Sequence, residues 1–160
     1  MTDQGKTYAT FIENELKVER DRRTSLDARG LNIVSVSGSL TTLLVAVGAF
    51  VSGRQGFKFP RDAVLPLVGT LGAFVLAAIL GIVASAGRRY QVTIPPTLAA
   101  MLTDHWQDHE VDARNYVSIQ HVKTITSLRS GNRRKELVII TATLFQIVGI
   151  VILSYGGLFT

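Results

Sequence analysis

The sequence contains no cysteine, which excludes disulfides, thiolate metal sites and cysteine nucleophiles. Three long stretches also lack every charged residue: 31–53, 63–87 and 137–160. A phosphate-binding loop, a dinucleotide-binding glycine pattern and a Gly-x-Ser-x-Gly nucleophile elbow are missing as well. We therefore expect no enzymatic activity and no cofactor.

The three uncharged stretches predict an all-α integral membrane protein with three transmembrane helices. Each exceeds the roughly 18 residues expected of a spanning helix, and none has the polar face that a soluble helix needs. We expect an N-terminal cytoplasmic helix within residues 1–30, an external turn over 54–62 and a helical cytoplasmic loop over 88–136. The charged first 30 residues lack the apolar core of a signal peptide, so the first span is expected to act as an uncleaved targeting signal.

The distribution of positive charge predicts the orientation. The net charge is +5, and fourteen of the seventeen basic residues lie before the first span or between the second and third. The positive-inside rule then places the N-terminus and the long loop in the cytoplasm of a bacterial cell, with the chain in its plasma membrane. We expect the lipid bilayer, not nucleic acid, to be the partner of this charge. The predicted inner-leaflet anchors are Arg22, Arg23, Arg29, Arg88, Arg89, Arg133, Arg134 and Lys135.

The second uncharged stretch has a small residue at every fourth position. These residues are Gly69, Ala73, Ala77, Gly81 and Ser85. That spacing puts them nearly in line on one helix face, where another helix can approach closely. The partner is another span of the same chain or of a second copy, and we expect a homo-oligomer.

The first and third stretches contain a few polar side chains. Ser35, Ser39 and Thr42 recur at three- and four-residue steps and form a polar stripe. The stripe is interpreted either as a helix–helix interface, packed against the small-residue ridge, or as one wall of a hydrated path. In the third stretch Gln146 is expected to make an interhelical hydrogen bond.

The long loop is predicted to be helical in two parts. A Pro-Pro pair at 95–96 stops the preceding helix and can start a new one over 97–107. A second helix is expected over 111–128, followed by a break or kink at Ser-Gly-Asn 130–132. A cytoplasmic protein partner is expected to bind through residues 91–135.

Two histidines in this loop are the candidates for metal binding. His105 and His109 are four residues apart, which would place them on one helix face beside Asp108. The His-Glu-x-x-His pattern of metalloproteases is absent, because Trp106 follows His105. We expect no metal; the alternatives are a solvated, locally acidic helix end and a pH-responsive contact through the imidazoles.

Parts of the sequence resemble known membrane proteins, namely residues 19–30 with 33–38 and residues 132–137. They look like a group of small, largely uncharacterised integral membrane proteins of high-GC Gram-positive bacteria, some of them described as plasmid-transfer membrane proteins. More distantly, the layout is similar to the helical membrane effectors of bacterial nucleotide-signalled antiphage systems. The matching motifs are juxtamembrane charge patterns, and no nucleotide-binding residue can be carried over.

These observations leave three hypotheses for function. The first is a non-enzymatic oligomeric membrane scaffold or adaptor, with plasmid transfer as the process that the resemblance implies. The alternative is a membrane-permeabilising effector of a bacterial defence system, controlled through its cytoplasmic helices. The third is a membrane enzyme or metal protein that uses His105 and His109.

Overall fold

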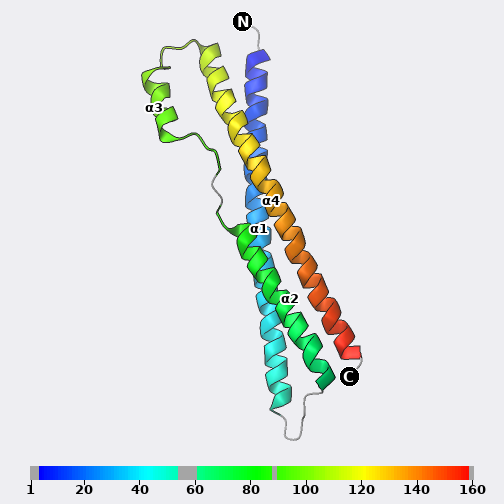
Figure 1. Cartoon of the computed structure of the whole chain (residues 1–160). Helices are drawn as coiled ribbons and strands as arrows, with labels where there is room; N and C mark the ends of the chain where they lie inside the picture. The colour runs from blue at the N-terminus through cyan, green and yellow to red at the C-terminus, as the bar shows by residue number, and fades with distance from the viewer. Residues whose placement is uncertain (1–3, 54–60, 88–89, 159–160) are drawn as a thin grey trace. The chain divides into compact units, whose positions relative to one another are not determined.

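The computed structural model describes residues 4–53, 61–87 and 90–158. Within them the chain is all-helical, with α1 (Gln4–Ser52), α2 (Arg61–Ser85), α3 (Pro95–Thr103) and α4 (Glu110–Leu158) (Figure 1). The helices α1, α2 and α4 are each long and apolar enough to cross a membrane. The predicted all-α fold with three membrane-spanning helices is confirmed to that extent.

The chain divides into two compact units. The first comprises residues 1–25 and 87–134, and the second residues 26–86 and 135–160. Both long helices therefore contribute to both units, while α2 belongs to the second and α3 to the first. All three uncharged stretches, apart from Gly87, fall in the second unit.

The second unit packs the three apolar helices through small side chains. Ala77 and Ala84 of α2 and Ala142 of α4 are completely buried, beside Ile33 of α1 and Ile139 of α4. In lipid, helix association depends on close van der Waals contact and interhelical hydrogen bonds, because burying apolar surface gains little there. Small residues let the helix backbones approach closely enough for such contacts.

The first unit has a much smaller apolar core. Leu16 of α1 is buried with Ile125 and Leu128 of α4, and Ile12 and Tyr90 pack against them. α1 and α4 run in the same direction (Figure 1), and residues 15 and 19 of α1 pair with residue 129 of α4. So small an apolar core leaves much of the pairing to polar contacts.

The first helix is longer than the sequence predicts. The sequence predicts an N-terminal helix that ends near Arg29–Gly30 and a separate first span. In the structure the two form one continuous helix, α1. The helix continues through Gly30, where α1 and α2 approach each other closely. A Cβ on Gly30 would lie 3.0 Å from the Gly81 carbonyl oxygen of α2. Packing, not backbone flexibility, explains this glycine.

The sequence predicts a break or kink at residues 130–132, and the break is wrong. α4 runs without interruption from Glu110 to Leu158. A Cβ on Gly131 would overlap the ring of Tyr90, so the glycine makes room for an aromatic side chain. Asn132 is fully buried and hydrogen-bonded to α1. Gly131 and Asn132 are residue types that are typical of turns, but in this helix they contact Tyr90 and α1, which are distant in the sequence.

The short helix α3 is also displaced from the prediction over 97–107. Pro95 and Pro96 occupy its first two positions, where their missing N–H groups cost little. The helix ends at Thr103, and residues 104–108 form turns. Trp106 therefore lies outside the helix, at 75% exposure.

Candidate functional site

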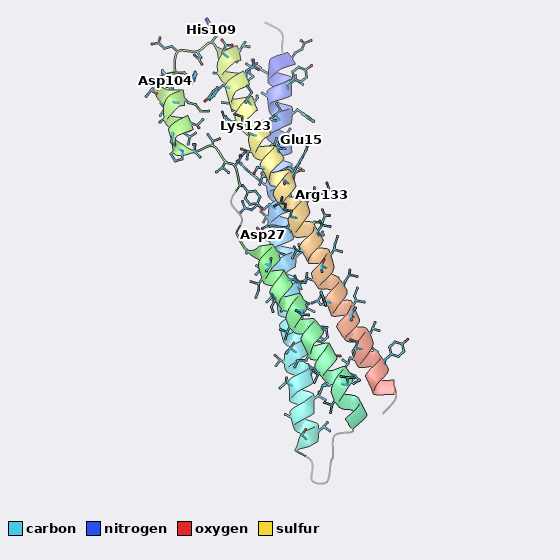
Figure 2. The ribbon with its side chains drawn as sticks, viewed as in Figure 1. Glu15, Asp27, Asp104, His109, Lys123 and Arg133 are labelled. Carbon is cyan, nitrogen blue, oxygen red and sulfur yellow. The ribbon has the colours of Figure 1, made fainter. Side chains whose placement is uncertain are left out.

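A buried carboxylate joins the two helices of the first unit. Glu19 is only 5% exposed, and its carboxylate accepts hydrogen bonds from Arg129 Nε at 3.0 Å and from Asn132 Nδ2 at 3.0 Å. Asn132 Nδ2 also donates to the Glu19 carbonyl oxygen at 3.1 Å. Arg129 reaches a second carboxylate, Glu15, which Figure 2 labels. Charged groups at this depth need such partners, and these contacts fix the register of α1 on α4.

The same contacts favour the charged form of Arg129, which an arginine keeps at physiological pH even without them. The hydrogen bond with Glu19 is the main cause that raises the pKa of Arg129, and the charges of Glu19 and Glu15 add to it against the desolvation that lowers it. A base whose pKa is raised on folding adds stability at every pH below its ordinary value. That stability is lost only in strongly alkaline solution, so Arg129 stays charged across the physiological range.

A second feature of the first unit is the position of Tyr90. Its ring lies against the backbone of Gly131, and the guanidinium of Arg23 stands over the ring at 4.3 Å from the centroid. The following residue is held too, because the Gln91 N–H donates to Ser127 Oγ at 2.9 Å. The chain that enters α3 is thereby attached to the middle of α4.

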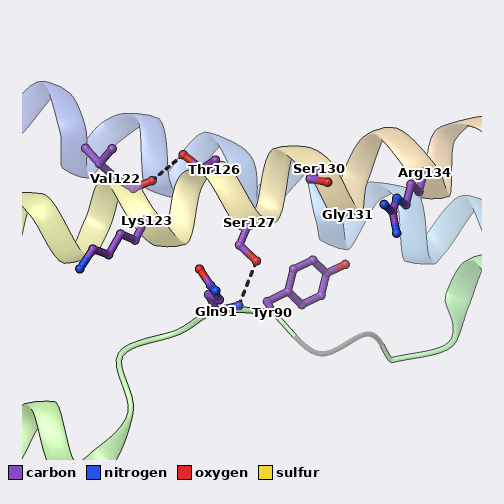
Figure 3. Close-up of a pocket in the computed structure, with 9 residues that line it drawn as sticks. All are labelled: Tyr90, Gln91, Val122, Lys123, Thr126, Ser127, Ser130, Gly131 and Arg134. Carbon is purple, nitrogen blue, oxygen red and sulfur yellow. Dashed lines mark hydrogen bonds between the residues drawn. The ribbon is translucent and has the colours of Figure 1, made fainter.

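These residues line a pocket of about 630 Å³ along one side of α4 (Figure 3). Lys123 and Arg134 stand at its two ends, with Tyr90 between them (Figure 3). The lining residues are Tyr90, Gln91, Val122, Lys123, Thr126, Ser127, Ser130, Gly131 and Arg134. The described lining thus combines two cations and several hydroxyl groups with one aromatic ring.

Lys135 is predicted to anchor the chain at the inner leaflet, but it lies inside the protein. The side chain is fully buried, and its ammonium pairs with Asp27 of α1. A buried cation needs such a partner, since its desolvation costs several kcal/mol. Lys135 is therefore a packing contact within the second unit and does not face headgroups.

The other predicted anchors are mostly at the surface. Arg22, Arg29, Arg133 and Arg134 are exposed, and Figure 2 labels Arg133 on α4. Arg23 is half-buried over Tyr90. Arg88 and Arg89 lie outside the described residues.

The small-residue ridge of α2 faces its neighbours over most of its length. Ala73, Ala77 and Gly81 are buried, Ser85 is half-buried, and Gly69 is exposed. A Cβ on Gly81 would lie 2.8 Å from the Gly30 carbonyl oxygen and 2.9 Å from Val34 Cγ2. The Gly81 end of the ridge packs against the face of α1 that carries residues 30, 33 and 34, whereas Ala73 lies against Gly149 of α4.

The polar stripe of α1 lies on a different face. Ser35, Ser39 and Thr42 are exposed, so the structure does not pack them against the ridge. Thr42 Oγ1 donates to the Gly38 carbonyl oxygen of its own helix at 2.9 Å. Successive helical residues turn by about 100°, so Ser35 points nearly opposite to the buried Ile33.

Gln146 makes an interhelical hydrogen bond, with Ser37 as its partner. Its Nε2 donates to Ser37 Oγ at 2.8 Å and to the Ile33 carbonyl oxygen at 3.2 Å. Thr70 of α2 is also buried and donates to the Gly149 carbonyl oxygen at 3.3 Å. Both bonds tie spans together at apolar depth.

The two histidines do not share a helix face. His105 lies in the turns after α3, and His109 precedes the first residue of α4; Figure 2 labels Asp104 and His109 at the two ends of this connection. His105 Nδ1 contacts Asp108 Oδ2 at 2.9 Å, and its ring lies on Tyr116. Among the described residues, no three His, Cys, Asp or Glu side chains are grouped to hold a metal ion.

Sequence reasoning missed Glu19, Asn132 and Tyr90. The signal for Glu19 was present, because it follows Ile12 and Leu16 at helical spacing and falls on the same face. Asn132 and Tyr90 carry no such signal: their roles depend on partners more than 30 residues away in the chain.

Comparison of the chain with protein-family models, with curated proteins and with solved structures finds no match.

Proposed function

We propose that this chain is a non-enzymatic, oligomeric adaptor of the bacterial plasma membrane, with its N-terminus and α3 on the cytoplasmic side. Three helices long enough to span a membrane support the membrane location. The excess of basic residues on one side of the spans supports the orientation. Plasmid transfer remains the process that the resemblance suggests.

The observation that carries the adaptor role is the exposed apolar surface of α3 and its flanks. No residue of α3 is buried. Leu98 and Leu102 lie about one turn apart on α3, Ile94 directly precedes the helix and Trp106 lies in the turns after it, and each is at least half exposed. Large apolar side chains grouped in this way mark a surface that a partner covers.

A protein is a better occupant of this surface than lipid. His105, beside Trp106, rests on Tyr116 of α4, which lies 21 residues before the uncharged stretch begins at Leu137. At about 1.5 Å per residue, that is roughly 30 Å along the helix from the start of the apolar run. The end of the surface beside His105 is therefore too far along α4 to contact lipid, which supports a protein as its occupant.

Site-specific photo-crosslinking in living cells tests the proposal. A benzophenone amino acid at Leu102 should yield an adduct between this chain and a second polypeptide, because Leu102 lies in the exposed surface of α3. The same probe at Ile119, which is exposed on α4, is the matched control and should yield no such adduct. Mass spectrometry of the adduct identifies the partner.

Equal yields at the two positions, or no adduct at Leu102, would contradict binding through α3. Co-expression of two differently tagged copies separates the remaining outcomes. An adduct that carries both tags would show that the surface binds another copy of the chain and would overturn the adaptor role. An adduct with one tag and a different polypeptide supports it.

One observation favours a membrane-permeabilising effector as the second candidate. The hydroxyl groups of Ser35, Ser39 and Thr42 lie outside the contacts that pack the three spans of one chain. In an oligomer, such a stripe from each copy can line a hydrated path.

A further inference from the structure

The pocket beside Tyr90 has a charge of one sign. Among the described residues Lys123 and Arg134 line it, and no carboxylate does. Its other polar groups include the hydroxyls of Thr126, Ser127 and Ser130. A pocket with these properties favours an anion that is rich in hydrogen-bond acceptors.

The hydroxyl of Tyr90 makes this preference more specific. Among the described residues it is one of two buried side-chain polar atoms without a hydrogen-bond partner. Its hydroxyl points toward the Arg134 end of the pocket (Figure 3). A buried O–H left without an acceptor is costly, and an anion at this end would accept both from it and from the guanidinium.

The Arg134 end of the pocket lies close to the apolar part of the chain. Arg134 comes three residues before Leu137, where the third uncharged stretch begins. Tyr90 comes five residues after Ser85, the last residue of α2. Chain segments so close to the ends of two spans lie near the depth of lipid phosphates.

We propose that the Tyr90–Arg134 end of this pocket binds the phosphate group of an anionic ligand. The Arg134 guanidinium supplies the charge, and the Tyr90 hydroxyl donates a hydrogen bond to a phosphate oxygen. An anionic phospholipid and a soluble phosphate ester offer the same group. Lys123 lies eleven residues from Arg134, about 16 Å along the helix, so one phosphate cannot contact both. The proposal rests on the membrane location and not on the adaptor role.

Native mass spectrometry of the full chain in neutral detergent tests this site. The wild-type protein should retain phosphatidylglycerol in preference to phosphatidylcholine. The change Arg134→Gln should weaken this binding by about tenfold, the effect of losing one charge-assisted hydrogen bond. Tyr90→Phe should weaken it by roughly threefold or more, while the melting temperature stays equal or rises because an unpaired buried hydroxyl is removed.

The neighbouring Arg133→Gln is the matched control. Arg133 is also exposed but does not line the pocket, so its variant should bind as the wild type does. Competition by glycerol phosphate assigns the site to soluble phosphate esters, and its absence assigns the site to lipid; either result supports a phosphate site. Wild-type affinity in Arg134→Gln or in Tyr90→Phe, or equal losses in Arg133→Gln and Arg134→Gln, would overturn the proposal.

Discussion

Two glutamates on one face of α1 pair with the same arginine but differ in burial. Glu19 is almost fully buried and also accepts from Asn132, whereas the Glu15 side chain is 34% exposed. We predict that Glu19→Gln lowers the free energy of unfolding of the first unit by about 1–3 kcal/mol, because a buried charged hydrogen-bond network is disrupted. Glu15→Gln should cost less than about 1 kcal/mol, as exposed ion pairs do.

Hydrogen exchange of the detergent-solubilised chain measures both effects. The amides of residues 8–22 should lose protection in Glu19→Gln, while those of α2, in the other unit, should be unchanged. Equal exchange in the two variants would mean that burial does not separate the two carboxylates.

At the scale of the helices, two glycines of α2 distinguish packing from backbone effects. Gly81 has no room for a Cβ beside Gly30 and Val34, whereas a Cβ on Gly72 would meet nothing within 4 Å. We predict that Gly81→Ala destabilises the second unit by about 1–3 kcal/mol, because overpacking forces the helices apart. Gly72→Ala should be neutral or stabilising by up to about 1 kcal/mol.

Unfolding in mixed detergent, followed by circular dichroism, measures this difference. Destabilisation by Gly72→Ala as large as that by Gly81→Ala would show that glycine itself, and not the close contact with α1, determines the stability.

Glycines within the long helices show how much of this fold can be predicted from sequence. The absence of charge over more than 20 residues was sufficient to predict three long helices, because a single uncharged stretch in lipid satisfies its own backbone hydrogen bonds only as a helix. Local sequence could not show that α1 and α4 continue through Gly30 and Gly131, since each glycine serves a distant partner, Gly81 and Tyr90. Likewise the period of Ser35 and Ser39 predicted a stripe on one face of the helix, but only the neighbouring helices determine which face is buried.

At the scale of the whole molecule, the exposed stripe of α1 separates the two candidate functions. An adaptor does not need these hydroxyl groups, because Ser37, and not the stripe, receives the interhelical hydrogen bond from Gln146. A permeabilising oligomer does need them, because a hydrated path requires polar groups on the surface that faces it. Removing the hydroxyls leaves the packing of each chain intact.

We therefore predict that the triple variant Ser35→Ala, Ser39→Ala and Thr42→Val distinguishes the two functions in cells that overproduce the chain. If the protein permeabilises membranes, leakage of a fluorescent dye should fall severalfold in the variant. Thr141→Val is the matched control, because Thr141 is an exposed hydroxyl of α4 that donates to its own helix. Membrane levels of all forms are compared by immunoblot. No leakage from the wild type, or equal leakage from the wild type and the triple variant, would exclude a pore lined by the stripe.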